Sequence, residues 1–163
     1  MNTEPETSSV ELKKSCDQAA GFLDSVFASA RLDLRTTVQE TVTGLSLNIY
    51  GSDSELLLND AGDLLDALQH LVNQAFGRSL PRGNRIICDV QSFRATRAAE
   101  LRAMANHAAG RVRATGLAFT FGPMSASERR IIHLTLAESS DLHTESMGDG
   151  LARKLRVSLR SPT

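Results

Sequence analysis

The sequence is poor in aromatic residues and cysteines and contains no long hydrophobic run. Its 163 residues include no tryptophan, one tyrosine and six phenylalanines, so few side chains are available to stack on nucleic-acid bases. Two cysteines, Cys16 and Cys88, are too few for a disulfide framework or a cysteine-based zinc site. No apolar run approaches the ~20 residues of a membrane span, and residues 1–9 are polar and acidic, unlike a signal peptide. These absences predict a cytoplasmic protein that does not insert into a membrane.

The signatures of common enzymes and cofactor sites are also missing. The four histidines have no metal-ligand spacing among themselves or with the cysteines. Neither a phosphate-binding P-loop nor a dinucleotide fingerprint occurs. Cys88 lies in an apolar run typical of a buried strand, which favours a core residue over a nucleophile. The sequence therefore predicts a protein that is not an enzyme and holds no metal or cofactor.

Charge is abundant but unevenly divided along the chain. The formal net charge is only −1, yet residues 1–77 carry 12 acidic and 4 basic side chains, whereas residues 78–163 carry 14 basic and 7 acidic ones. A basic second half predicts a polyanionic partner. Neutralisation of the two halves across an internal interface explains the same numbers, and composition alone leaves both interpretations open.

The hydrophobic periodicity predicts an α+β fold in two subdomains that divide near residue 91. Residues 1–9 are predicted to be a disordered tail. Helical spacing predicts helices over 10–31, 63–76, 92–114 and 126–138. Alternating or continuous apolar runs predict strands over 32–40, 45–49, 86–90, 117–121, 142–146 and 154–159. Ser92 is the expected N-cap of the third helix.

The most informative local motif begins the last predicted helix. It consists of the capping box Ser125-Ala126-Ser127-Glu128 followed by Arg129-Arg130-Ile131-Ile132-His133. Helical geometry places Arg129, Arg130 and His133 on the side away from the isoleucines, where we expect both arginines to be exposed. Two cations in a first turn oppose the helix dipole. Stability does not require them, whereas phosphate binding does. For the two arginines alone, an ordinary solvated face is the alternative.

A family resemblance adds to this motif. The residues that carry it are Pro123-Met124, the run 128–133, Thr144-Glu145-Ser146 with Gly148, and Arg153. They closely resemble the C-terminal domain of the Jag (SpoIIIJ-associated) family, which is named R-3-H for an arginine and a histidine separated by three residues. Arg129 and His133 match that pair. Domains of this type are implicated in binding single-stranded nucleic acid, so the resemblance implies that Arg129, Arg130 and His133 bind single-stranded RNA or DNA.

The resemblance continues upstream and spans about residues 17–160. Residues 64–73 resemble a helix of the family's KH domain, and residues 89–97 resemble the segment that leads into its long linking helix. The implied fold is a KH-like α/β domain over 10–91, joined by a long helix to a small R-3-H α/β domain within 92–163. The extra N-terminal domain of some family members is expected to be absent.

One departure from the family lies in the loop that clamps nucleotides in KH domains. The usual Gly-x-x-Gly loop is replaced by Asn59-Asp60-Ala61-Gly62, which keeps only the second glycine. Asp60 stands where the family has a basic residue, and negative charge repels phosphate. We expect Asn59 to adopt a positive φ that preserves the turn. The KH-like domain is then a poor or lost RNA-binding surface that serves as a scaffold or contacts proteins.

Other basic residues extend the candidate nucleic-acid surface. In the last predicted strand, Leu155, Val157 and Leu159 are expected to face the core. The phosphate contacts predicted near this strand are Arg153, Lys154, Arg156 and Arg160. Arg94 and Arg97 are either nucleic-acid contacts or partners of carboxylates such as Asp89, and the sequence leaves both interpretations open.

Taken with the resemblance, these residues predict a protein that binds single-stranded RNA mainly through its R-3-H domain. The implied setting is bacterial post-transcriptional regulation linked to cell elongation or division. The alternative is a protein-interaction adaptor that has lost RNA binding through its KH domain. The resemblance also allows a homodimer, or a heterodimer with a small KH protein.

Overall fold

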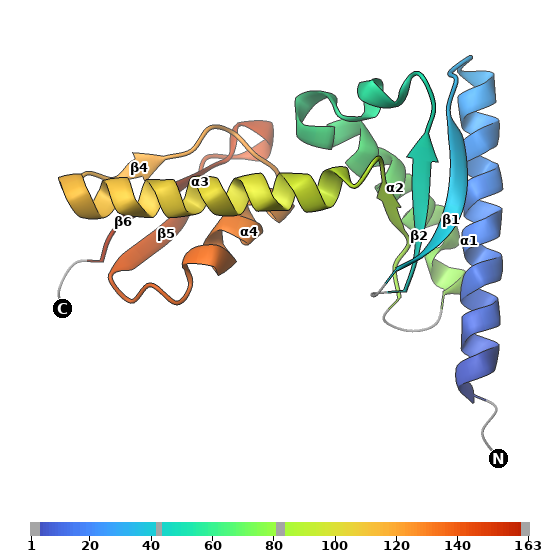
Figure 1. Cartoon of the computed structure of the whole chain (residues 1–163), viewed down its shortest axis with the longest axis horizontal. Helices are drawn as coiled ribbons and strands as arrows, with labels where there is room; N and C mark the ends of the chain where they lie inside the picture. Colours follow the sequence, from blue (N-terminus) through green and yellow to red (C-terminus); the bar gives the residue numbers. More distant parts are fainter. Residues whose placement is uncertain (1–3, 42–43, 81–83, 161–163) are drawn as a thin grey trace. The chain divides into compact units, whose positions relative to one another are not determined.

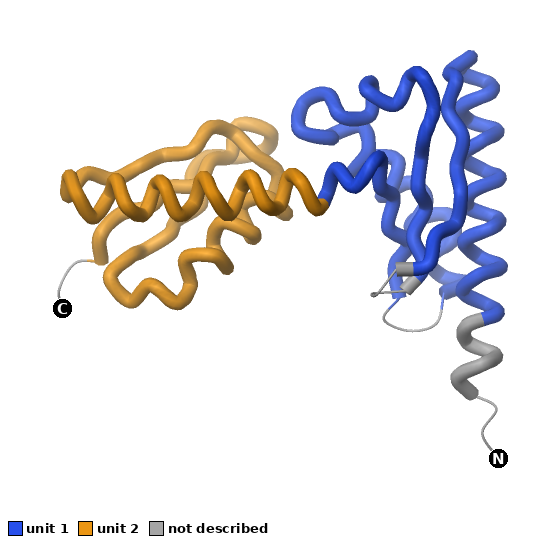
Figure 2. Tube along the Cα trace, in the orientation of Figure 1, with its two compact units in different colours: residues 1–94 blue, residues 95–163 orange. Residues whose placement is uncertain are grey.

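The computed structural model describes residues 4–41, 44–80 and 84–160, without the side chains of residues 4–9, 41 and 44. The chain divides into two compact units, unit 1 over residues 1–94 and unit 2 over residues 95–163 (Figure 2). Each unit contains a three-stranded sheet and helices. The predicted α+β class is therefore confirmed, and the division falls three residues after the position expected from the sequence.

Unit 1 is built on a mixed sheet in the order β1-β2-β3 (Figure 1). Its elements are α1 (Glu4–Ser29), β1 (Arg35–Thr41), β2 (Gly44–Tyr50), α2 (Asp63–Phe76) and β3 (Ile87–Asp89). Strand β1 is antiparallel to β2, whereas β2 is parallel to β3. A parallel pair needs a crossover connection, and α2 supplies it.

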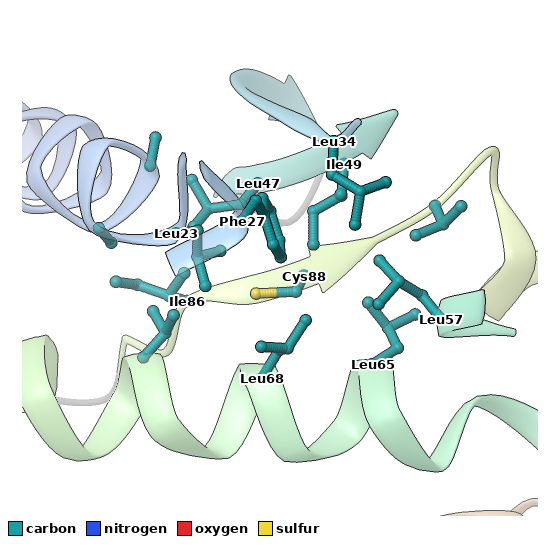
Figure 3. Close-up of a cluster of buried hydrophobic side chains, with 14 of the residues drawn as sticks. Leu23, Phe27, Leu34, Leu47, Ile49, Leu57, Leu65, Leu68, Ile86 and Cys88 are labelled. Atoms are coloured by element: carbon teal, nitrogen blue, oxygen red, sulfur yellow. The ribbon is translucent and has the colours of Figure 1, made fainter. Parts of the chain in front are cut away.

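The core of unit 1 lies between helices α1 and α2 and the sheet (Figure 3). Leu23 and Phe27 come from α1, and Leu65 and Leu68 rise from α2 toward Cys88 on β3. Cys88 is fully buried, and this burial raises the pKa of its thiol to about 12. The thiol is therefore neutral near pH 7 and behaves as a core residue, as its apolar neighbours predicted.

Two predictions for unit 1 need correction. Helix α1 begins at Glu4 rather than at residue 10, so the predicted tail over 1–9 is too long; residues 1–3 lie outside the described residues. Ser92 does not cap α3 (Phe93–Thr115), because its φ is +60°, outside the extended conformation of an N-cap. The Asp89 carboxylate takes that role, since its Oδ1 accepts the backbone N–H groups of Val90 at 2.9 Å and Arg94 at 3.2 Å.

Unit 2 is built on an antiparallel sheet in the order β4-β6-β5. Besides most of α3, its elements are β4 (Phe119–Thr120), α4 (Ala126–Leu136), β5 (Leu142–Met147) and β6 (Lys154–Leu159). Buried side chains of α3, α4 and one face of the sheet form a single cluster. The members from the sheet and its approach are Phe121, Leu142, Leu155 and Val157. Both helices therefore cover the same face, and no helix among the described residues of unit 2 packs on the opposite face.

At the edges of this sheet, the apolar alternation predicted longer strands and more buried residues than the structure has. Leu117 is 73% exposed. Leu159 lies opposite the buried Leu142 and so on the covered face as expected, but at the end of β6 it is 41% exposed and does not join the core. Leu117 also lies outside β4, which spans only two of the five residues predicted as a strand. Phe121 is buried and forms an edge-to-face pair with the half-buried Phe119, at 5.0 Å between ring centroids. The central positions of the pattern thus predict the core, whereas its ends do not.

Candidate nucleic-acid interface

The start of α4 is fixed by the predicted capping box. The Ser125 hydroxyl accepts the backbone N–H of Glu128 at 3.3 Å, and the Ser125 backbone N–H donates to Glu128 Oε2 at 3.0 Å. Glu128 is only 7% exposed, and its Oε1 accepts Nε of Arg97 from α3 at 2.8 Å. One carboxylate therefore caps the helix and ties its first turn to α3, which fixes the direction of the side chains that follow.

Arg129 and His133 are held by two hydroxyl groups of β5. Arg129 Nη1 donates to Ser146 Oγ at 2.9 Å, and His133 Nδ1 lies 2.6 Å from Thr144 Oγ1. The two helical residues are one turn apart, and the two strand residues lie on the same face because strand side chains alternate. Helix and strand thus form two parallel contacts that orient the arginine and the histidine together.

A shallow hollow of about 440 Å³ lies over these contacts and is here named the α4 hollow. Its lining residues are Ala126, Arg129, Arg130, His133, Thr144, Ser146 and Leu155. None of them is acidic, and Ala126 belongs to the N-terminal turn of α4, where the helix dipole attracts anions. The hollow therefore combines two guanidinium groups with the positive end of a helix.

The two arginines of the α4 hollow differ in exposure. Arg130 is exposed as expected and forms no ion pair within the described residues. Arg129 is half-buried, so the expectation that it would be exposed is wrong. Its Nε is buried and lacks a hydrogen-bond partner in the described part of the chain. A buried donor without a partner is costly, and an anion in the hollow is one group that can satisfy it.

The other basic residues predicted for this surface do not all gather at the α4 hollow. Cross-strand register places Lys154 opposite Met147 and Arg156 opposite Glu145. Both basic side chains are exposed and alternate with the buried Leu155 and Val157, so they lie on the uncovered face of the sheet, away from the hollow. Arg153 is closer to the start of α4, because its carbonyl accepts the backbone N–H of Met124 at 3.2 Å.

Arg94 and Arg97 are both engaged in ion pairs. In unit 1, Arg94 Nε donates to the Cys88 carbonyl at 2.7 Å. Its Nη2 lies 2.8 Å from Asp66 Oδ1, in an ion pair whose geometry falls outside that of a hydrogen bond. In unit 2, Arg97 binds Glu128 and also contacts Glu100 at 3.2 Å. The carboxylate partners differ from the Asp89 suggested by the sequence, but the ion-pairing alternative accounts for both arginines.

The loop that precedes α2 is turned but carries no positive charge. Asp60, Ala61 and Gly62 have φ values of +51°, +61° and +86°, so the left-handed positions do not include Asn59, where one was expected. A Cβ on Gly62 would lie 2.7 Å from Cε1 of the Phe93 ring. Gly62 is therefore required both by its φ and by Phe93. With Asp60 and Asp63 at the start of the helix, the loop presents carboxylates where a phosphate site needs donors and cations.

Sequence reasoning missed the two hydroxyl partners of the interface. Thr144 and Ser146 were quoted only as part of a family motif, although their spacing at alternate strand positions indicates a shared face. Which strand face meets α4 depends on the packing of the whole unit, which periodicity does not reveal. For the residues that the structure describes, no group of three or more histidine, cysteine or acidic side chains is arranged to hold a metal ion. No helix in the same residues is long and apolar enough to span a membrane.

Comparisons with known proteins identify the region around α4 and the relatives of the chain. Residues 99–159 match the family model of the R-3-H domain. The RNA-binding protein KhpB of Clostridium symbiosum is 31% identical over 146 residues, which cover 88% of this chain and 66% of the relative. KhpB of Bacillus subtilis is 31% identical over 143 residues, covering 86% and 69%. KhpB of Lactiplantibacillus plantarum is 31% identical over 115 residues, covering 71% and 36%. The chain thus spans about two thirds of the first two relatives and about one third of the third.

Proposed function

The chain belongs to the family of the RNA-binding protein KhpB, and on that premise we propose that it binds single-stranded RNA through the α4 hollow. In this proposal the guanidinium groups of Arg129 and Arg130 donate to phosphate oxygens, and His133 adds a donor one turn after Arg129. Single-stranded DNA offers the same phosphate groups and is the second proposed ligand. The family match over residues 99–159 supports this location.

One observation carries the proposal: Arg129, whose buried Nε has no hydrogen-bond partner within the described residues, lines a hollow without acidic side chains. An ordinary solvated face needs neither the Ser146 and Thr144 contacts nor a buried donor, because exposed arginines are satisfied by water. Two cations in the first turn also cost a few tenths of a kcal/mol through the helix dipole. A phosphate ligand offsets both costs at once. Binding of this kind contacts the backbone and discriminates weakly among sequences.

The test is a fluorescence-anisotropy titration of a short labelled oligouridylate with the full chain. Arg129→Glu combined with Arg130→Glu is expected to weaken binding about 100-fold. The slope of log affinity against log salt concentration should also fall by the amount expected for the loss of about two phosphate contacts. Because Arg129 also contacts Ser146, Arg130→Glu alone gives a variant that leaves the fold undisturbed. Arg102→Glu on the exposed side of α3 is the matched control, with the same charge change elsewhere in unit 2. Equal affinities for the control and the double variant would reject the proposal.

For unit 1 we propose a KH-like domain whose loop no longer binds phosphate. The order α1-β1-β2-α2-β3 with a turned loop before α2 supports the KH-like part. Asp60 in that loop and Asp63 at the first position of α2 support the loss of RNA binding. The same acidic loop favours a second candidate function, in which the protein is an adaptor that binds proteins and not RNA. An adaptor predicts no salt-dependent binding of oligouridylate by the wild-type chain.

The finer points of the family resemblance remain part of this proposal. They are a role in bacterial post-transcriptional regulation linked to cell elongation or division, a cytoplasmic location, and pairing with a second copy or with a small KH protein. Arg153 is the additional basic residue best placed to extend the α4 hollow. Because Lys154 and Arg156 lie on the uncovered face of the sheet, they contact the same RNA only if the RNA passes around the edge of the sheet.

A further inference from the structure

The hairpin that joins β5 to β6 carries an exposed apolar side chain at its tip. Leu151 is 91% exposed, more than any other large hydrophobic residue that the structure describes. Arg153 and Lys154 follow it, and neither forms an ion pair within the described residues. Single exposed leucines are common on protein surfaces, so exposure alone assigns no role. The position of the hairpin supplies the further argument.

Both arms of this hairpin start at the lining of the α4 hollow. On one arm, Ser146 accepts a hydrogen bond from Arg129, and β5 ends one residue later, at Met147. On the other arm, the carbonyls of Arg153 and Leu155 accept the backbone N–H groups of Met124 and Phe121. The hairpin therefore runs beside the segment that leads into α4, and Leu155 itself lines the hollow. Leu151 lies in the turn between these two arms, five residues after Ser146 and four before Leu155, both of which line the hollow.

The tip is a compact turn. Gly148 and Gly150 have φ values of +82° and +54°, and residues Gly150–Ala152 form a short 3₁₀ turn closed by Arg153 N–H to the Gly150 carbonyl at 3.3 Å. A Cβ on Gly148 would lie 3.4 Å from the Ala152 carbonyl oxygen, so the two arms approach closely. Such a turn presents Leu151 at a defined place, which lowers the entropy lost when the side chain makes a contact.

We propose that Leu151 packs against a base of the single-stranded RNA whose phosphates occupy the α4 hollow. This inference rests on the proposed function. The hollow, proposed to bind the sugar–phosphate backbone, contains no phenylalanine, tyrosine or tryptophan side chain. Its one ring is the imidazole of His133, which lies 2.6 Å from Thr144 and is assigned to phosphate in the proposed function, so the adjoining bases have no dedicated stacking platform there. Leucine is among the apolar side chains that proteins place against base faces, and Arg153 lies close enough in sequence to reach a neighbouring phosphate. A lipid surface also suits an apolar tip beside cations, but the donors of the adjoining hollow favour RNA.

The experiment compares two probes of equal length, an oligouridylate and an oligomer with the same sugar–phosphate backbone but no bases. Leu151→Ser in the full chain is expected to weaken binding of the oligouridylate about five-fold and to leave the abasic probe unaffected. Its salt dependence should stay that of the wild type, because losing an apolar contact changes no counterion release. Leu117→Ser is the matched control, since Leu117 is 73% exposed and lies toward the opposite end of β6. The control should bind both probes as the wild type does.

Each other outcome overturns the inference. Unchanged binding of both probes by Leu151→Ser would reject the contact with a base while leaving the proposed function intact. An equal loss with both probes would show an effect on the fold or on phosphate binding. A wild-type chain that binds neither probe would reject the proposed function and this inference together. Anionic phosphatidylglycerol vesicles released by Leu151→Ser, with oligouridylate binding unchanged, would assign the tip to a membrane.

Discussion

The N-terminal turns of helices α2 and α4 carry side chains of opposite charge. Helix α2 of unit 1 follows a left-handed loop that contains Asp60 and begins with Asp63 and Asp66, whereas α4 of unit 2 begins with a capping box followed by Arg129 and Arg130. Carboxylates stabilise a helix N-terminus, and cations oppose it. The acidic start therefore suits the helix dipole, whereas the basic start opposes it, and the phosphate ligand proposed above would account for that arrangement.

The contrast extends to the charge of the whole units. Unit 1 contains 13 acidic and 8 basic residues, and unit 2 contains 6 acidic and 10 basic ones. Several cations are nevertheless engaged in ion pairs, such as Arg97 with Glu128 and Arg113 with Asp141. Arg129 differs from these, because its Nε is buried and has no hydrogen-bond partner in the described structure. The buried donor therefore distinguishes the proposed binding surface in a way that the net charge of unit 2 does not.

Among the predictions on the two helix starts, the largest effect is expected from Glu128, which completes the capping box of α4 and binds Arg97 of α3. Glu128→Ala removes the capping acceptor of Ser125 and leaves Arg97 without its main partner. We expect the free energy of unfolding of unit 2 to fall by about 3 kcal/mol, from about 1 kcal/mol for the cap and about 2 kcal/mol for an ion pair whose arginine remains partly solvated. Urea unfolding followed by circular dichroism measures the change.

Two further variants make this prediction specific. Glu128→Gln can still accept from the backbone at the cap, so it should lose less than the alanine variant. Glu138→Ala, just beyond α4, changes charge equally. Glu138 is exposed and forms no ion pair with the residues that the structure describes, so this variant should unfold as the wild type does. If Glu128→Ala and Glu138→Ala unfold at the same urea concentration, the support assigned to Glu128 does not exist.

The acidic start depends instead on backbone geometry. Gly62→Ala adds a Cβ 2.7 Å from the Phe93 ring at a φ of +86°, so we expect unit 1 to lose about 2 kcal/mol. Gly116→Ala also has a positive φ, +69°, but no atom lies within 4 Å of the added Cβ. Its cost should be only the conformational one, about 1 kcal/mol. Equal losses for the two variants would show that Phe93 does not restrict Gly62.

Most of the fold follows from local patterns in the sequence. Helix α2 has the predicted bounds, and the capping box appears where its four residues place it. These features depend on residues within one or two turns of each other, which periodicity and capping rules describe well. The cap assigned to Ser92 and the burial assigned to Leu159 were wrong for a different reason. Asp89 accepts the N–H group at the start of α3, and Leu159 is the last residue of β6, where it stays partly exposed.

The candidate site was only partly predictable, because it combines residues from separate elements. Helical spacing placed Arg129 and His133 on one face, but their contacts with Ser146 and Thr144 depend on how α4 meets β5. Alternation along β6 predicted that Lys154 and Arg156 point outward. The alternation did not show that these two side chains lie on the sheet face opposite α4, because a strand pattern does not indicate which face the helices cover.

The central claim is that RNA is bound at the basic start of α4 and not at the acidic start of α2. The most direct measurement is the salt dependence of oligouridylate affinity for the full chain carrying either Arg130→Ala or Asp60→Ala. The account predicts that Arg130→Ala weakens binding and lowers the salt slope by about one phosphate contact, whereas Asp60→Ala leaves the slope unchanged. A slope unaffected by Arg130→Ala but altered by Asp60→Ala would contradict the account and place the RNA on the loop of unit 1.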